Sequence, residues 1–192
     1  MKNKTDASVN NTRIRTSIPQ ALIRIFALLV VIGITVYIYS IREHISQYTV
    51  YGYPGIFLIA LLTNATVLVP APGVAVVYAM GGVFNPLGVA LAAGTGGALG
   101  ELSGYLAGFS GQAVVENNRL YEKLQPWIQK YGPWAILVLA AIPNPFFDTA
   151  GIIAGITKMH ISHFLLACWG GQLIKMSLFA FAGAYSLNLI VW

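Results

Sequence analysis

Apolar segments interrupted by polar and proline-rich stretches predict a chain made mostly of membrane-embedded helices. Residues 1–20 are polar and predict a disordered cytoplasmic tail, because their composition cannot build a core. An uncharged run from Ile25 to Ile41 is long enough, with its flanking turns, to cross a hydrocarbon layer of about 30 Å. A cleaved signal peptide is the alternative, but the run is long for one and lacks a small-residue cleavage site. We therefore predict an N-terminal transmembrane helix over residues 21–45.

Two later regions, 51–85 and 131–156, each contain a pair of short apolar arms separated by a break. The residues at these breaks are Pro70, Pro72, Gly73, Pro143 and Pro145. At 1.5 Å rise per residue, an arm of roughly 11–15 residues reaches only about 16–22 Å, which is too short to cross the bilayer. We predict two re-entrant helical hairpins. Their irregular backbone must be covered by protein or line a water-filled cavity.

A full-length apolar span follows each hairpin, over residues 87–110 and 161–185. Residues 112–130 between the two halves mix charged and apolar side chains instead. Their apolar positions recur at i, i+4, i+7 and i+8, namely Leu120, Leu124, Trp127 and Ile128. This spacing predicts an amphipathic helix that lies in the membrane interface, with a solvated loop as the alternative.

The two halves match each other as an internal repeat. Asn64 matches Asn144 at an offset of 80 positions. Beyond the breaks the offset becomes 74, and it matches Gly81 with Gly155 and Glu101 with Lys175. Chance similarity in a glycine-rich chain is the alternative, but ordered agreement of breaks, glycines and charges favours a repeat.

Basic residues orient the chain. A cytoplasmic N-terminus puts the basic tail, residues 112–130 and Lys158 inside and only Arg42 outside, as the positive-inside rule requires. The first hairpin then enters from outside and the second from inside. We therefore predict an all-α polytopic membrane protein, an inverted repeat of hairpin plus transmembrane helix over 51–110 and 131–185, preceded by one transmembrane helix. The expected location is the plasma membrane of a prokaryote.

Composition agrees with this architecture. The chain is 57% hydrophobic and 9% charged, with a mean hydropathy of +0.70, whereas soluble domains carry about 25% charged residues. The net charge of +5 does not indicate nucleic-acid binding, because the basic residues flank apolar segments. The single cysteine, Cys168, excludes an intramolecular disulfide framework, and His160 and His163 stand without carboxylate partners for a metal.

Four glycines follow one face of the first long span at intervals of four residues. They are Gly96, Gly100, Gly104 and Gly108. Such a stripe lets two helix backbones approach closely, so we predict a helix-packing surface there.

Three ionisable residues, Glu101, Asp148 and Lys175, lie inside apolar segments. A charge at the bilayer centre costs at least about 2.5–3.5 kcal/mol, so these residues are candidates for a substrate or ion pathway. Asn144 and Asn64, near the hairpin tips, join them. The structural alternatives are a buried ion pair between Glu101 and Lys175, and a helix cap for Asp148. No nucleophile–base pair or cofactor motif appears, so we predict no enzyme activity and no cofactor.

Two segments resemble a known family. The string GTGGALGEL at residues 94–102, followed by Tyr105, resembles the GxxxGE signature of the VTT-domain superfamily. That group includes DedA proteins, SNARE-associated Golgi proteins and vacuole membrane proteins. The string IPNPFFDTAG at 142–151 is similar to the vacuole-membrane-protein version of the second hairpin. The resemblance covers roughly residues 50–185.

This resemblance implies a lipid transporter that flips or scrambles phospholipid or polyprenyl-phosphate lipid, with membrane lipids as partners. DedA proteins usually carry arginines in the second hairpin and an acidic residue in the first. Here the corresponding positions are Ala140, Ala141, Phe146, Phe147 and, in the first hairpin, Asn64. A scramblase-like role therefore fits better than proton-coupled transport. An ion-coupled small-solute transporter, using a proton or cation, and a non-transporting membrane assembly factor are the alternatives, and an oligomer is compatible with each.

Overall fold

The computed structural model describes most of the chain from residue 49 onward. The described residues are 29, 33, 49–65, 73–111, 118–144 and 147–190. The predicted tail, the predicted N-terminal transmembrane helix except residues 29 and 33, and the break residues Pro70, Pro72 and Pro145 lie outside them.

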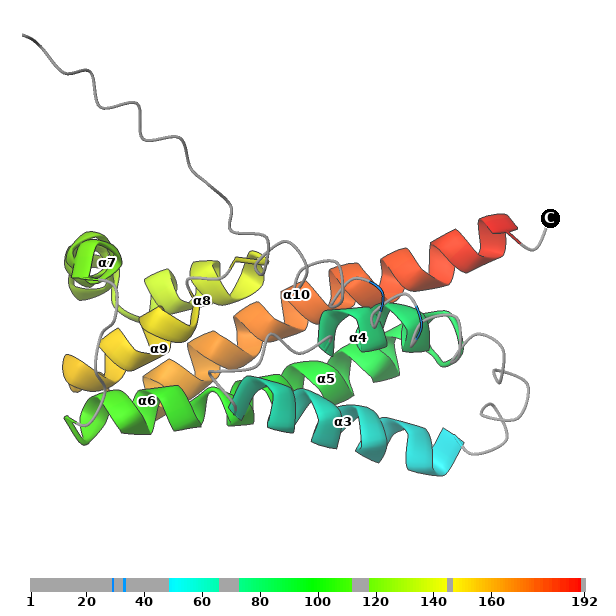
Figure 1. Cartoon of the computed structure of the whole chain (residues 1–192), viewed down its shortest axis with the longest axis horizontal. Helices are drawn as coiled ribbons and strands as arrows, with labels where there is room; N and C mark the ends of the chain where they lie inside the picture. Colours follow the sequence, from blue (N-terminus) through cyan, green and yellow to red (C-terminus); the bar gives the residue numbers. More distant parts are fainter. Residues whose placement is uncertain are drawn as a thin grey trace, which may run out of the picture.

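Every element in the described part of the chain is a helix, as the sequence predicts. The helices are α3 (Thr49–Ala65), α4 (Gly73–Gly81), α5 (Pro86–Gly100), α6 (Leu102–Phe109), α7 (Asn118–Tyr131), α8 (Pro133–Ala141), α9 (Phe147–Ile156) and α10 (Ile161–Ile190). Figure 1 shows α3, α5, α6, α8, α9 and α10 running roughly along one direction, while α7 is seen end-on and crosses them at one end.

The short arms form as predicted by the proline and glycine breaks. The arms α4 and α8 have 9 residues each and α9 has 10. At 1.5 Å per residue they reach only about 14–15 Å, about half of a hydrocarbon layer. The arm α3 is longer, with 17 residues. Asp148 lies within the first turn of α9, one residue after its start.

Two matched asparagines satisfy carbonyl groups at the inner ends of the first arms. Asn64 Nδ2 donates to the Ala60 carbonyl at 2.8 Å, four residues earlier in α3. Asn144 Nδ2 donates to the Leu139 and Ile142 carbonyls, each at 2.8 Å, at the end of α8. The Leu139 and Ile142 carbonyls lie at the end of α8, where carbonyl groups have no partner within the helix.

The first long span is interrupted. The sequence predicts one helix over 87–110, whereas the structure has α5 and α6 with Glu101 between them. Glu101 keeps a right-handed helical backbone, with φ −64° and ψ −16°. Its N–H donates to the Gly97 carbonyl at 3.1 Å, and its own carbonyl accepts from the Tyr105 N–H at 3.2 Å. The backbone therefore continues in a nearly helical path through Glu101. The two helices together extend about 36 Å.

The second long span is α10, with 30 residues. Its segment Ile161–Ser186 is long and apolar enough to cross a membrane, and no other single helix in the described part of the chain meets that test. Large apolar side chains are exposed on several helices, among them Leu62, Leu106, Trp134 and Leu178. An apolar outer surface of this kind suits lipid contact better than water.

Each pair of short arms divides its contacts between the two long spans. The arms α3 and α8 pack against the long helix of their own half, α5 and α10 respectively. The arms α4 and α9 pack against the long helix of the other half, α10 and α6. In Figure 1 the pair α3 and α4 and the pair α8 and α9 consequently lie towards opposite ends of the molecule.

Similar close backbone contacts occur within each half. A side chain at Gly96 would collide with the Phe57 carbonyl oxygen, and a side chain at Gly171 would lie 2.5 Å from the Leu137 carbonyl oxygen. Phe57 and Leu137 are 80 positions apart, whereas the two glycines are 75 positions apart, one more than the offset of 74 found from the sequence. In each half, the first arm therefore packs closely on a glycine of the long helix of the same half.

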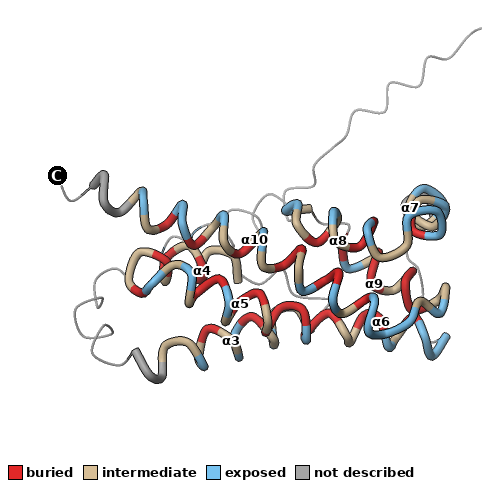
Figure 2. The backbone as a smooth tube through the Cα atoms, turned by 180° about the vertical axis from the view of Figure 1, so that it is seen from behind, coloured by how far each residue is buried: buried red, intermediate tan, exposed pale blue. Residues whose placement is uncertain are grey.

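The buried residues form two clusters, and each draws side chains from both halves. The first includes Ile56, Val77 and Val89 together with Met176 of α10. The second centres on α8, α9 and the first part of α10 and also includes Ala98 and Tyr105. Figure 2 shows many buried positions along α5, which lies between α3 and α4. In α7 only one face joins the second cluster, through Ile128 and its neighbours, while Glu122 and Lys123 are exposed.

Candidate functional site

Glu101 lies at the junction of α5 and α6 and is turned towards α9. Its side chain is only 4% exposed. Its Oε2 atom would lie 3.9 Å from a Cβ built on Gly151 of α9. The absence of a side chain at Gly151 lets α9 approach the carboxylate. Glu101 therefore faces the protein interior and not lipid.

Asp148 lies one turn before Gly151 on α9 and is exposed. In the first helical turn its carboxylate is stabilised by the partial positive charge of the helix N-terminus. Glu101, Asp148 and Lys175 interact electrostatically with one another. The structure thus brings together the three ionisable residues that the sequence singles out. No ion pair within 4.0 Å joins any two of them in the described part of the chain, so the predicted Glu101–Lys175 pair is not formed directly.

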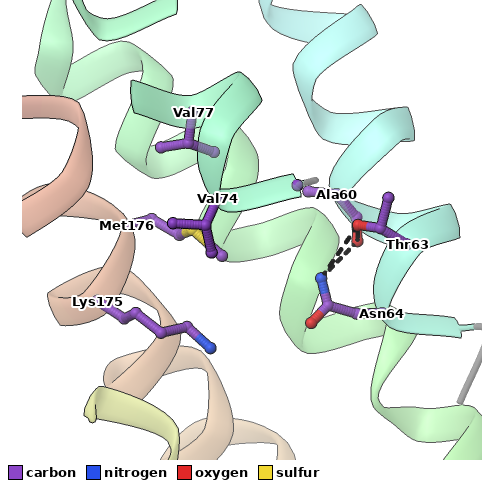
Figure 3. A pocket seen from close by; sticks show the side chains of 8 residues that line it. Ala60, Thr63, Asn64, Val74, Val77, Lys175 and Met176 are labelled. Atoms are coloured by element: carbon purple, nitrogen blue, oxygen red, sulfur yellow. Dashed lines mark hydrogen bonds between the residues drawn. The ribbon is translucent and has the colours of Figure 1, made fainter. Parts of the chain in front are cut away.

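Lys175 extends from α10 into a cavity under the first pair of short arms. The cavity has a volume of about 100 Å³, room for several water molecules. Its other lining residues come from α3, α4 and α10: Ala60, Thr63, Asn64, Gly73, Val74, Val77 and Met176. Figure 3 shows the ammonium group of Lys175 directed towards Asn64. On the other side, Lys175 Nζ lies 5.7 Å from the ring centroid of Phe147, the residue before Asp148.

The two predicted asparagines have different neighbours. Asn64 lines the cavity, and its Oδ1 accepts a long hydrogen bond of 3.5 Å from Gln172 Nε2. Asn144 does not line this cavity, and its Nδ2 is bonded to carbonyls of α8. The structure therefore adds Asn64 to the surroundings of Lys175 and leaves Asn144 at the end of its own arm. Pro143 is exposed beside it.

Gln172 is a polar residue of the site that the sequence analysis did not identify. It lies on α10 one turn before Lys175 and is completely buried. Its Oε1 atom has no hydrogen-bond partner among the described residues. A Cβ at Gly97 would lie 3.4 Å from Gln172 Cδ and 3.4 Å from Asn64 Nδ2. An amide side chain in a largely apolar span was the available signal.

The glycine stripe meets two different helices. Gly96 and Gly100 face α3, where a Cβ at Gly100 would lie 2.5 Å from the Leu61 carbonyl oxygen. Gly104 and Gly108 face α9. A Cβ at Gly108 would collide with the Ile152 carbonyl, whereas one at Gly104 would have only ordinary contacts of 3.8–3.9 Å.

The surroundings of Glu101 and Lys175 are matched in position but opposite in charge. At the same offset of 74 that relates these two residues, Asp148 matches Val74 and Gly151 matches Val77. Glu101 meets α9 beside Gly151 while Lys175 shares a cavity with Val74 and Val77 of α4. One half of the site is therefore acidic and the other half basic.

One further contact joins matched positions to each other. Trp169 Nε1 on α10 donates to Thr95 Oγ1 on α5 at 3.1 Å, and these residues are 74 positions apart. No cluster of three metal-ligating side chains occurs among the described residues.

Comparisons with known proteins bear on the whole arrangement. A comparison with curated proteins found no match, and a comparison with solved structures found none either. A family model described as the VTT domain matches residues 69–185, which contain Glu101, Asp148 and Lys175. This domain is typical of membrane-associated DedA and SNARE-associated proteins. Because the match covers more than half of the 192 residues, the chain belongs to the VTT-domain family of membrane proteins.

Proposed function

We propose that this protein moves lipids between the two leaflets of a membrane, in a scramblase-like or flippase-like way and without enzymatic chemistry. The observation that carries the proposal is the cluster of Glu101, Asp148 and Lys175, of which Lys175 lines a small cavity together with Thr63 and Asn64. Charges are retained at membrane depth only at a cost, so a cluster of three is typical of a pathway for polar groups.

The proposed architecture is an inverted repeat of two re-entrant hairpins, each followed by a long helix. It is supported by the equivalent contacts of Phe57 and Leu137 and by the Thr95–Trp169 hydrogen bond between matched positions. Two hairpins that meet from opposite sides leave a polar route at the centre while apolar surfaces face lipid. A lipid headgroup would follow that route and its acyl chains would remain in the bilayer.

The proposed orientation keeps the N-terminus, α7 and Lys158 in the cytoplasm of a prokaryotic cell. The amphipathic α7 supports an interfacial position, because its apolar face joins the protein and its charged face is exposed. The excess of basic residues on this side supports the same orientation.

Ion-coupled transport of a small solute is the second candidate function. The cavity beside Lys175, at about 100 Å³, is smaller than a whole phospholipid headgroup and favours this alternative in the present conformation. Two carboxylates against one ammonium group also suit the binding of a proton or cation. A third role, as a membrane assembly factor without transport, would use the glycine contacts only.

Leaflet exchange in liposomes tests the proposal. Purified full-length protein is reconstituted with phospholipids that carry a fluorophore on one acyl chain, and a membrane-impermeant quencher reports the outer-leaflet fraction. Lipid translocation predicts that quenching exceeds the outer-leaflet half, in proportion to the number of protein-containing liposomes. Glu122→Gln on the exposed face of α7 is the matched control for Glu101→Gln. Quenching limited to the outer leaflet in wild-type liposomes would exclude lipid translocation.

A further inference from the structure

A groove at the α7 end of the molecule lies apart from the cluster of charged residues described above. We propose that this groove, between α8 and α10, binds one anionic phospholipid as a fixed ligand, with its phosphate beside His163 and Lys158 and one acyl chain along Trp134. The residues of the charged cluster do not line the groove. The inference concerns a bound lipid and not a transported one, so it does not depend on the proposed function.

The groove consists of two adjoining cavities that share Pro133 and His163. The outer cavity has a volume of about 330 Å³, and its lining includes the polar side chains of Gln129, Thr157 and His163. The inner cavity has a volume of about 240 Å³ and is lined mainly by apolar side chains, those of Trp134, Leu137, Leu166 and Ala167. A polar end that continues into an apolar channel matches the division of a phospholipid into headgroup and acyl chain.

The directions of the helices give the depth of the two cavities in the membrane. The amphipathic α7 crosses the other helices at this end of the molecule, and both α8 and α10 begin there (Figure 1). The exposed aromatic side chains of Tyr131 and Trp134 at the same end are typical of the membrane–water interface. Leu166, which lines the inner cavity, lies about 4.5 Å further along α10 than His163. The outer cavity is therefore at headgroup depth, and the inner cavity extends towards the hydrocarbon layer.

Basic side chains surround the outer cavity without a carboxylate. Lys158 is exposed and lies between Thr157 and Met159, which both line this cavity, and within the described part of the chain its ammonium group forms no ion pair. The His160 ring lies 5.6 Å from the His163 ring and lines a neighbouring cavity together with Lys158. None of the acidic residues that the structure describes lines any of these three cavities. The charge of the groove therefore complements an anion.

The same charge pattern favours an anionic headgroup over a zwitterionic one. Both classes carry a phosphate, to which the Lys158 ammonium group and a ring N–H of His163 can donate hydrogen bonds. The headgroup ammonium of a zwitterionic lipid has no carboxylate partner in the groove and meets repulsion from Lys158. An unfavourable contact with the competing ligand is a general source of specificity. Because the acyl chain makes the same contacts in both classes, the headgroup alone determines the preference.

Titration of the purified full-length protein in detergent with single lipids, followed by native mass spectrometry, measures this preference. Phosphatidylglycerol and phosphatidylcholine with identical acyl chains are compared. We expect the first phosphatidylglycerol to bind roughly tenfold more tightly than the first phosphatidylcholine, which corresponds to about 1.4 kcal/mol. Neither lipid has to be transported in this measurement.

Matched substitutions separate the headgroup from the acyl chain. Lys158→Met should bring the ratio of the two affinities close to one, whereas Lys158→Arg, which keeps the charge, should preserve it. Lys123→Met on the exposed face of α7 should also preserve it. Leu166→Ala should weaken both lipids by a similar factor, because it removes apolar contact without a change in charge. Its control is Leu178→Ala, since the two leucines are 63% and 61% exposed on the same helix and only Leu166 lines the groove.

Several results would overturn the inference. Equal affinities for the two lipids in the wild type would leave the groove with ordinary lipid contacts only. An equal loss of preference in Lys123→Met and Lys158→Met would place the anion on α7, and an equal loss of affinity in Leu166→Ala and Leu178→Ala would place the acyl chain outside the groove. A dimer that excludes the lipid would assign the groove to a second copy of the chain. Each of these results leaves lipid translocation untouched, and absence of leaflet exchange in liposomes would leave this site standing.

Discussion

Gly100 and Gly104 lie one turn apart on the first long span, but only Gly100 is tightly packed against a neighbouring helix. The two positions therefore allow a matched test of the fold. A Cβ at Gly100 would lie 2.5 Å from the Leu61 carbonyl oxygen and 2.9 Å from the Ala65 nitrogen, both rigid backbone atoms of α3. A Cβ at Gly104 would meet only the Asp148 carbonyl oxygen at 3.8 Å and a side-chain atom of Ile152 at 3.9 Å.

Alanine at each position gains a similar helix propensity, so the variants differ mainly in overpacking. Forcing a methyl group into a filled interface costs about 1–3 kcal/mol. For a chain of this size, each kcal/mol shifts the unfolding midpoint by roughly 2–4 °C. We therefore expect Gly100→Ala to unfold about 2–12 °C below Gly104→Ala, and Gly104→Ala to stay close to the wild type.

Thermal unfolding of the purified protein in detergent, followed by the loss of monodisperse protein on gel filtration, measures this difference. The second half offers a repetition of the test. A Cβ at Gly171 would lie 2.5 Å from the Leu137 carbonyl oxygen, whereas one at Gly170 would lie 3.6 Å from a side-chain carbon of Leu137. Equal stability of Gly100→Ala and Gly104→Ala would refute the contact between α3 and α5.

Three further predictions concern the site and the topology. Glu101→Gln combined with Lys175→Met should fold well yet fail to exchange lipids, and recovered exchange would reduce Glu101 to a structural residue. Single cysteines at Arg42 and Lys123 should react with an impermeant thiol reagent from opposite sides of the membrane; labelling of both from one side would contradict the inverted repeat. Gln172→Leu removes a buried unsatisfied carbonyl, so we expect thermal stability to be kept or raised by about 1 kcal/mol while lipid exchange slows. A stability loss without a change in exchange would make Gln172 a structural residue.

Features that depend on local sequence were predictable. Proline, glycine and charged residues mark helix ends through local sterics and solvation, so 161–185 anticipates most of α10 and 112–130 anticipates most of α7. The family resemblance, carried by GTGGALGEL and the second proline segment, is confirmed by the family match over 69–185. The expectation that Glu101 faces protein also follows locally, because it shares a helix face with glycines.

Features that depend on tertiary contacts were not predictable. The interruption at Glu101 arises in a segment with no proline, and nothing in its composition distinguishes it from a continuous helix. The stripe of glycines divides between α3 and α9, a division that requires the positions of both neighbours. Gln172 belongs to the site because it lies next to Asn64 and Gly97, which are on other helices. The alternative of a direct ion pair between Glu101 and Lys175 is not formed in the structure. Aligning the two repeats shows that these residues correspond, but it does not give the distance between them.

Within the proposed inverted repeat, the matched positions serve helix packing and the unmatched positions form the polar site. Glycine contacts and helix breaks are alike in both halves, so two conformations that exchange the roles of the hairpins would have similar packing energies. Polar residues are unlike: Lys175 replaces Glu101, Val74 replaces Asp148, and Gln172 replaces Ala98. A symmetric scaffold makes both conformations accessible, since small energy gaps allow both to be populated. An asymmetric polar set provides one binding site and not two competing ones. Substitutions at the glycines should therefore alter stability, while substitutions at the charged residues should alter lipid exchange.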